Sequence, residues 1–268
     1  KHPNNVGSSR RDFIRNLAFG IGGVSALYYG LPEAIGRNID TRLSSIAKKS
    51  KDKLGIALVG LGSYSTHQLA PALQQTKNCY LAGIVTGTPS KAEKWKEQYS
   101  IPDKNIYSYE NFDTIKNNPD IDIVYVVLPN SMHAEYTIRA AEAGKHVICE
   151  KPMATTVEDA EKMVEACKKA NRLLAVGYRL HYDPHNQHMM KLGQEQTFGK
   201  IKTLEAAHSF VIGNNRNAWR LDGELAGGGP LMDLGVYCTQ GVLYTLGETP
   251  TAITAQFGEV TKPNLFDS

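Results

Sequence analysis

Residues 54–65 read LGIALVGLGSYS, an apolar run that ends in a glycine pair and leads into an amphipathic stretch. The run from Leu54 to Gly60 predicts a buried strand, and Tyr64 to Gln75 predicts the helix that follows it. The first glycine permits a tight turn after the strand, and Gly62 lets the backbone approach a ligand. The helix after Ser63 offers free N–H groups and a positive end to a pyrophosphate, although a glycine pair can also be a plain turn.

The alternation of strand and helix continues to about residue 178. The expected elements are strand 80–85, helix 90–99, a short helix at 111–116, strand 121–128, helix 134–143, strand 146–149, helix 156–170 and strand 173–178. Strands this apolar belong to a parallel sheet that helices cover on both faces. We therefore predict an α/β fold with an N-terminal Rossmann dinucleotide-binding domain over residues 54–177.

The pattern changes after this region. A helix is expected at 184–192, a long alternating strand at 200–211, a helix at 231–246 and a strand at 251–258. These elements predict a partial α+β domain for substrate binding and oligomerisation over 178–268, with an open, mostly antiparallel sheet. So few strands would leave an apolar edge open, which indicates that the C-terminal part of this domain lies beyond residue 268.

The totals of the chain exclude some classes of protein. With 268 residues, of which 41% are hydrophobic, it can bury a core. Its 30 basic and 27 acidic residues form no basic stripe, so we expect no nucleic-acid partner. The four cysteines are Cys79, Cys149, Cys167 and Cys238. Their wide spacing favours separate buried thiols over a zinc site or a disulfide framework, and we expect no metal.

The N-terminus carries a pair of arginines, Arg10 and Arg11, ahead of an apolar stretch from Leu17 to Leu31. This pattern predicts a twin-arginine (Tat) export signal over residues 1–36, followed by an arm or linker over 37–53. The alternative is a membrane helix, but four glycines break the apolar stretch and it is short for a span. The Tat export machinery is thus an expected partner, and the expected location is the periplasm.

The end of the second predicted strand bears on the choice of cofactor. It reads Val85-Thr86-Gly87-Thr88-Pro89-Ser90-Lys91 and holds no carboxylate that would bind a ribose 2′-hydroxyl and repel a 2′-phosphate. The hydroxyls of Thr86 and Ser90 and the charge of Lys91 favour NADP over NAD. The alternative is that this stretch only caps a helix. A second ligand-facing loop follows the most apolar strand, where His133 either contacts a ligand or caps the next helix.

Three residues are candidates for proton transfer, namely Tyr237, Lys151 and His181, and Asp233 is a candidate for holding the substrate hydroxyls beside Tyr237. Lys151 follows the strand 146–149, and Asp233 and Tyr237 are four residues apart on a predicted helix, so their side chains share one face. An ammonium such as that of Lys151 would lower the pKa of a nearby tyrosine from its ordinary value of about 10. The alternatives are a first-turn carboxylate for Asp233 and a packing role for Tyr237.

Five ordered motifs point to a family. They are Gly60-Leu61-Gly62, Pro129-Asn130-Ser131-Met132-His133-Ala134-Glu135, Cys149-Glu150-Lys151-Pro152-Met153-Ala154, Gly177-Tyr178-Arg179-Leu180-His181-Tyr182-Asp183-Pro184 and Gly227-Gly228-Gly229-Pro230-Leu231-Met232-Asp233-Leu234-Gly235-Val236-Tyr237. From Leu54 to its end the chain resembles the Gfo/Idh/MocA oxidoreductases, and it is most similar to the glucose-fructose oxidoreductase branch, to which Tyr237 in place of a histidine points.

The resemblance implies a sugar oxidoreductase. Lys151, Asp233 and Tyr237 would act at the nicotinamide of a tightly held NADP, and the bond before Pro152 would be cis. An aldose would be oxidised and a ketose or another carbonyl reduced, by a homo-oligomer, either a dimer or a tetramer. Alternatives are a conventional NAD(P)-dependent sugar or polyol dehydrogenase and a non-catalytic sugar sensor.

The residues expected to bind each ligand follow from the motifs and the resemblance together. Those for the cofactor are Gly60, Gly62, Ser63, Tyr64, Thr86, Ser90, Lys91, Leu128, Pro129, Asn130, His133, Glu150, Lys151 and Arg179. Those for the sugar are Lys151, Tyr178, His181, Tyr182, Trp219, Arg220, Asp233 and Tyr237.

Overall fold

The computed structural model of the chain describes residues 53–210 and 218–256. The expected export signal, residues 37–52 of the expected arm, and the ends of two expected strands at 211 and 257–258 lie outside the described residues.

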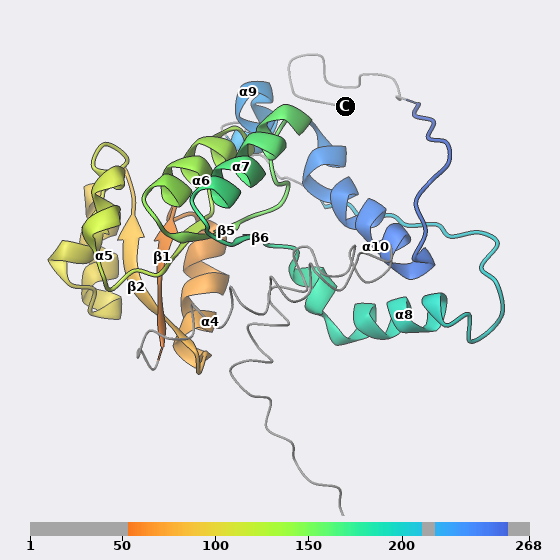
Figure 1. Cartoon of the computed structure of the whole chain (residues 1–268), viewed down its shortest axis with the longest axis horizontal. Coiled ribbons are helices and arrows are strands. Elements are labelled where there is room, and N and C mark those ends of the chain that lie inside the picture. The colour runs from red at the N-terminus through yellow and green to blue at the C-terminus, as the bar shows by residue number, and fades with distance from the viewer. Residues whose placement is uncertain (1–52, 211–217, 257–268) are drawn as a thin grey trace, which may run out of the picture.

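A six-stranded parallel sheet organises the first part of the molecule (Figure 1). Its strands are β1 (Leu54–Val59), β2 (Cys79–Val85), β3 (Ile106–Tyr107), β4 (Ile123–Val126), β5 (His146–Cys149) and β6 (Leu174–Val176). They lie in the order β3-β2-β1-β4-β5-β6, which is the doubly wound order of a Rossmann fold. The predicted α/β Rossmann fold is confirmed. β3 was not predicted, because two residues are too few to show a period.

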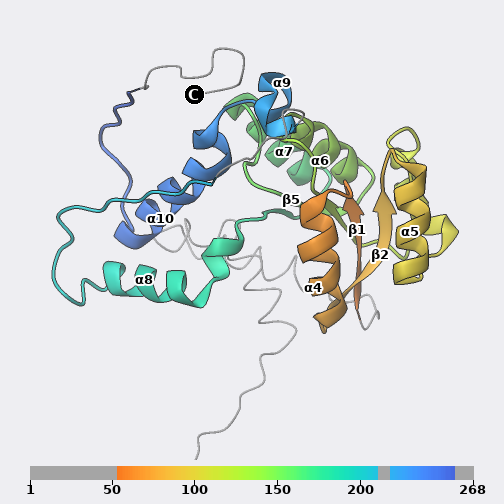
Figure 2. The same ribbon diagram turned by 180° about the vertical axis from the view of Figure 1, so that it is seen from behind.

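Helices cover both faces of the sheet, as Figures 1 and 2 show from opposite sides. α6 (His133–Glu142) and α7 (Val157–Lys169) pack on one face against buried residues such as Val59 and Val126. α4 (Ala70–Gln75) and α5 (Pro89–Tyr99) cover the other face, where Trp95 packs with Leu58. Alternate side chains of β1 therefore enter opposite cores, which explains why the whole strand is apolar.

The predicted helices of the remaining part are present. α8 (Pro184–Gln194) and α10 (Val236–Leu246) lie side by side, and a π-helical turn (Leu231–Gly235) leads into α10. A short helix, α9 (Gly223–Ala226), comes between them in sequence and lies close to the loops at the sheet edge.

The two strands predicted in this part are wrong over the residues that the structure describes. Residues 201–210 and 252–256 form no strand, and most of them are exposed. A strand needs a neighbouring strand to bond its backbone N–H and C=O groups, and neither segment pairs with another described segment. The predicted antiparallel sheet is therefore absent from the described residues.

The structure also shows the state of the four cysteines and the length of the apolar helices. Cys79, Cys149 and Cys167 are free and buried, as predicted, whereas Cys238 is free but only half-buried. No helix in residues 53–210 and 218–256 is both long enough and apolar enough to cross a membrane.

Candidate active site

A cavity of about 1030 Å³ opens at the carboxyl edge of the sheet. The loops after β1 and β4 meet there, and these neighbouring strands lead to opposite halves of the sheet. Doubly wound folds bind their ligands at this switch point. The lining includes sixteen of the predicted site residues: Gly60, Gly62, Ser63, Tyr64, Thr86, Lys91, Leu128, Pro129, Asn130, Glu150, Lys151, Arg179, Trp219, Arg220, Asp233 and Tyr237.

The glycine turn after β1 forms a cradle that fits a dinucleotide. Gly60 has φ +92°, and a Cβ there would come within 2.3 Å of the carbonyl oxygen of Val127. Gly62 lines the cavity, and a Cβ there would meet no described atom within 4 Å. Ser65 donates a hydrogen bond from its hydroxyl to the carbonyl of Gly60 at 2.6 Å. The serine that replaces a third glycine therefore closes the turn, and the space beside Gly62 is left for a phosphate.

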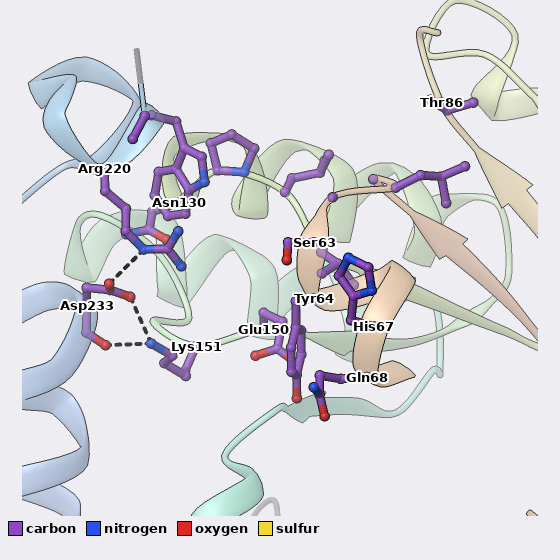
Figure 3. A pocket seen from close by; sticks show the side chains of 18 of the residues that line it. Ser63, Tyr64, His67, Gln68, Thr86, Asn130, Glu150, Lys151, Arg220 and Asp233 are labelled. Atoms are coloured by element: carbon purple, nitrogen blue, oxygen red, sulfur yellow. Dashed lines mark hydrogen bonds and ion pairs between the residues drawn. The ribbon is translucent and has the colours of Figure 1, made fainter. Parts of the chain in front are cut away.

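Thr86, which directly follows β2, lies at one end of the cavity (Figure 3), and Lys91, in the first turn of α5, also lines it. Lys91 donates a hydrogen bond from its ammonium to the carbonyl of Leu61 at 3.3 Å, so its charge lies beside the glycine turn. Ser90 was predicted for the same role, but it is exposed in the first turn of α5 and does not line the cavity. Of the two α5 residues that were predicted to bind the cofactor, Lys91 thus lines the cavity and Ser90 does not.

The opposite end of the cavity holds Lys151 and Asp233 (Figure 3). The ammonium of Lys151 lies 2.9 Å from Oδ1 of Asp233 and 2.5 Å from its backbone carbonyl oxygen. Arg220 Nε lies 2.8 Å from the other carboxylate oxygen, Oδ2. Burial by itself would raise the pKa of Asp233, but the hydrogen bond from Lys151 and the charges of Lys151 and Arg220 hold it below its ordinary value. Asp233 is therefore ionised at neutral pH.

Tyr237 lies next to this group in an arrangement different from the predicted one. The ammonium of Lys151 is 4.7 Å from the centre of the Tyr237 ring, over its face. The pKa of Tyr237 is raised to about 12, chiefly by burial and also by the charge of Glu150. The expectation that Lys151 lowers this pKa is thus wrong for this structure, and Tyr237 is a protonated phenol at neutral pH.

Glu150 is a buried carboxyl group in the cavity wall. Its side chain accepts a hydrogen bond from the hydroxyl of Tyr125, and the residue is 9% exposed. Burial raises the pKa of Glu150, although the hydrogen bond and the charges of Lys151 and Arg179 oppose this. Tyr64 lies nearby, and burial followed by the charge of Glu150 raises its pKa to about 12. Tyr64 and Glu150 thus form a part of the cavity wall in which burial disfavours the ionisation of both side chains.

His133 has a different role from the predicted ones. It is 1% exposed, and its ring nitrogens lie 2.8 Å from the carbonyl oxygen of Pro152 and 2.9 Å from that of Leu128. Burial lowers the pKa of His133. It neither lines the cavity nor caps α6 with its side chain. Instead, it links the loop after β4 to the loop after β5, where the Lys151–Pro152 bond is cis, as the resemblance implied.

Three residues predicted to bind sugar are not part of the cavity wall. Tyr178 packs edge-to-face on Tyr237 with ring centres 6.0 Å apart. The His181 ring is 4.9 Å from the Tyr182 ring and 4.7 Å from the Tyr244 ring, and burial lowers the pKa of His181. None of Tyr178, His181 and Tyr182 lines the cavity. Ring contacts with Tyr237 and Tyr244 of α10 hold Tyr178 and His181 in place, and Tyr182 packs on His181, so the prediction that these three residues line the sugar pocket is wrong for this cavity.

Some residues of the cavity wall were not predicted. They include His67, Gln68, Gly87, Thr88 and Tyr109. The ring of Tyr109 lies close to Gly87, since a Cβ at Gly87 would come within 3.1 Å of two ring carbons. Gly87 was visible at the end of a predicted strand. Tyr109 was hidden because it follows β3, which the sequence did not predict. Among the described residues, no three His, Cys, Asp or Glu side chains are grouped so that they could hold a metal ion.

Two family models match the chain, and both belong to the GFO/IDH/MocA family. One, described as an oxidoreductase family with an NAD-binding Rossmann fold, matches residues 54–178. The other, described as the GFO/IDH/MocA C-terminal domain, matches residues 186–267. The first match contains the sheet and the glycine turn, and the second contains Arg220, Asp233 and Tyr237.

Individual proteins are similar over about three quarters of the chain. A D-xylose 1-dehydrogenase [NADP(+)] of Haloarcula marismortui is 32% identical over 76% of the chain, and a 1,5-anhydro-D-fructose reductase of Ensifer adhaerens is 32% identical over 74%. The crystal structure of an aldose-aldose oxidoreductase from Caulobacter crescentus, complexed with glycerol, is 49% identical over 74% of the chain with a TM-score of 0.72. The chain spans 57%, 58% and 59% of the lengths of these three proteins, respectively.

Proposed function

Because the chain belongs to the Gfo/Idh/MocA oxidoreductase family, we propose that it is an NADP-dependent oxidoreductase acting on the CH–OH groups of sugars. The observation that carries the proposal is the meeting of Lys151, Asp233 and Tyr237 at one end of a cavity whose other parts fit a dinucleotide. Figure 3 shows how these residues follow one another along the cavity: Lys151 and Asp233 lie at one end, Ser63 and Tyr64 lie in the middle, and Thr86 lies at the other end.

The chain's own residues would hold the cofactor in a definite order. The turn at Gly60 and Gly62, with the start of the helix at Ser63, would bind the pyrophosphate. Thr86 and Lys91 would bind a ribose 2′-phosphate, which is why we propose NADP and not NAD. The remaining contacts in the proposal come from Tyr64, Leu128, Pro129, Asn130, Glu150 and Arg179. When bound, the nicotinamide supplies the acceptor and donor of hydride.

Tyr237 is the proposed acid and base. With its pKa raised to about 12, the phenol holds its proton at neutral pH and can give it from Oη to the carbonyl oxygen of a sugar that is being reduced. In the opposite direction, the phenolate that this transfer leaves at Oη takes the proton from the hydroxyl of a sugar that is being oxidised. Lys151 and Asp233 orient the sugar hydroxyls, since an ammonium donates and a carboxylate accepts. Trp219 and Arg220 form the wall beside them.

We propose further that the hydride passes from an aldose to a retained NADP and then to a second sugar, which is an aldose or a ketose. Support comes from the 49% identity to an aldose-aldose oxidoreductase. The finer resemblance to glucose-fructose oxidoreductase remains part of the same proposal, because both schemes use one site for two sugars in turn.

A survey of sugars against the purified protein tests this scheme. We expect an aldose to raise the near-ultraviolet absorbance of the reduced cofactor and a second sugar to lower it again, without added NADP. A conventional dehydrogenase is the second candidate, favoured by the similarity to D-xylose 1-dehydrogenase [NADP(+)]. Loss of the cofactor on gel filtration and turnover only with added NADP would establish that candidate. A sensor would bind the cofactor, but no sugar would change its absorbance.

The cellular setting is part of the proposal. Residues 1–36 are proposed as a Tat export signal and 37–53 as an arm, which would put the enzyme in the periplasm. Residues 54–177 are proposed as the cofactor domain, and 178–268 as part of a domain for substrate binding and assembly into a homo-oligomer. Replacement of Arg10 and Arg11 by Lys should keep the full-length protein in the cytoplasm, and a fractionation assay would measure this.

A further inference from the structure

Arg220 and Lys151 share one carboxylate. Arg220 Nε bonds to Oδ2 of Asp233 at 2.8 Å, and Lys151 Nζ bonds to Oδ1 at 2.9 Å. The Asp233 side chain is 15% exposed, that of Lys151 is 12% exposed and that of Arg220 is 41% exposed. The three side chains thus form a bridge from the cavity mouth to its interior. With both oxygens bound, the carboxylate cannot rotate without the loss of a charged hydrogen bond.

The segment that carries Arg220 is fixed at several points. The guanidinium lies 4.4 Å from the centre of the Trp219 ring. Asp222 caps α9 by accepting hydrogen bonds from the backbone N–H groups of Glu224 and Leu225 at 3.0 and 3.1 Å. These contacts position Arg220 relative to α9.

α9 is in turn attached to two loops at the sheet edge. Asn130, which is 3% exposed, donates a hydrogen bond from its side-chain amide to the carbonyl of Ala226 at 2.9 Å. Gly227 lies so close to Thr155 that a Cβ would come within 2.1 Å of the threonine methyl. The loop after β4 and the loop after β5 therefore determine where α9, and with it Arg220, lies.

The position of Asp233 determines two hydrogen bonds that the Lys151 ammonium donates. This ammonium bonds to the carboxylate and the backbone carbonyl of Asp233, and it lies over the Tyr237 ring. A carboxylate that turned away from Lys151 would leave a flexible side chain free to adopt other rotamers. A lysine at position 220 would keep the charge, but its ammonium would lack the planar fork of arginine.

We propose that Arg220 is a positioning residue, which holds the carboxylate of Asp233 so that Lys151 stays directed at Tyr237. The inference rests on the proposed function, in which these three residues carry out the chemistry. The segment 219–227 thus has a second role in the proposal: it covers the site and also sets the geometry of Asp233 and Lys151.

The first test does not depend on turnover. Aspartate carboxyl carbons are labelled with ¹³C in the full chain, and the signal of Asp233 is identified by its loss in Asp233→Asn. In Arg220→Met we expect the titration midpoint of Asp233 to rise by about one pH unit, since one of two cations is removed. Arg220→Lys should give a smaller rise, and Lys202→Met, which removes an exposed charge outside the cavity, should give none. A midpoint in Arg220→Met equal to that of the unaltered protein would overturn the inference.

The second test uses the sugar identified in the survey. We expect Arg220→Met to lower kcat about tenfold or more, with a smaller change in KM, and Arg220→Lys to recover part of kcat. A rise in KM with kcat unchanged would show that Arg220 only binds sugar, and this would also overturn the inference. If no sugar is turned over, the proposed function fails, while the carboxylate titration still decides whether Arg220 holds Asp233.

Discussion

The ammonium of Lys151 lies over the face of the Tyr237 ring, 4.7 Å from its centre, and donates its hydrogen bonds to Asp233 and not to the phenol. The phenol hydroxyl is therefore not ionised by direct contact with the ammonium. Burial dominates, and the pKa of Tyr237 is about 12. In the proposed reaction the two residues therefore have separate tasks: Lys151 orients the sugar, and Tyr237 holds the proton.

Tyr237→Phe should lower turnover by about 10² to 10⁴ while cofactor binding stays within about twofold of the original, because only the proton donor is lost. In the unaltered enzyme, sugar oxidation should rise with pH up to the limit of stability, since the fraction of phenolate grows until the pKa of about 12 is reached. Steady-state rates and cofactor fluorescence measure both. A plateau below pH 9 would contradict the raised pKa.

Asp233→Asn should destabilise the fold by about 3 kcal/mol at pH 7, because two cations lose a partly buried partner. The folded-state pKa of Asp233 is lowered, so its contribution to stability is present above the unfolded pKa of about 4 and is lost as the pH falls through the folded value. The difference between the two proteins should therefore shrink below about pH 4. Urea unfolding at a series of pH values measures it, and a difference that grows in acid would refute the prediction.

Glu150→Gln should have the opposite pH dependence. Because burial raises the pKa of Glu150, the carboxyl contributes most to stability below its unfolded pKa, and this contribution is lost as the pH rises through the folded value. The amide carries no charge and can still accept the hydrogen bond from Tyr125. We expect the variant to melt at a higher temperature than the unaltered protein at pH 8 and at a similar temperature at pH 4. Equal melting temperatures at pH 8 would contradict the prediction that the buried carboxylate of Glu150 lowers the stability of the protein at that pH.

Lys91→Met should weaken the binding of NADPH by roughly tenfold, with a smaller effect on NADH, because a ribose 2′-phosphate loses a charged partner. Lys94→Met is the matched control, since Lys94 is exposed on the same helix but outside the cavity wall. Fluorescence titration with both cofactors measures the ratio. An equal loss for NADPH and NADH would place the 2′-phosphate elsewhere.

Tyr109→Ala should weaken cofactor binding by about 1 to 3 kcal/mol if its ring stacks on the adenine, since an aromatic ring contributes about this much to a stacked base. Tyr80→Ala, which removes a tyrosine of β2 outside the cavity wall, is the control. Competition with 2′,5′-ADP and with nicotinamide mononucleotide separates the two ends of the cofactor. A loss confined to the nicotinamide fragment would show that Tyr109 does not contact the adenine.

The sequence predicted five of the six strands of the sheet because each of these five has its own local signal. β1 is an unbroken apolar run that ends in glycines, and β5 was predicted with the bounds that the structure has. The strand expected at 200–211 also had a local signal, an alternating pattern, and did not form in the described residues. Its hydrogen bonds depend on a partner strand, and a pattern within one segment cannot show whether that partner is there.

The candidate site divides in the same way. Motifs within a few residues of one another identified Gly60, Gly62 and Lys151, because turn chemistry and strand ends are local properties. The roles of His133 and Tyr109 could not be predicted in this way, because they depend on contacts between loops. The imidazole of His133 binds two carbonyls 24 residues apart in the chain, at Leu128 and Pro152. Tyr109 lines the cavity because it follows β3, a strand of only two residues.

The sequence by itself determined a doubly wound sheet, a glycine turn shaped for a dinucleotide, and the identity of the lysine, aspartate and tyrosine. Tertiary structure decided how these three meet. It put Lys151 over the ring of Tyr237 and bound both oxygens of Asp233, one of them to Arg220 from another segment. Burial and charge at that meeting point set the pKa of each group. Since both depend on distance in space, they follow from the folded arrangement and not from the order of the residues.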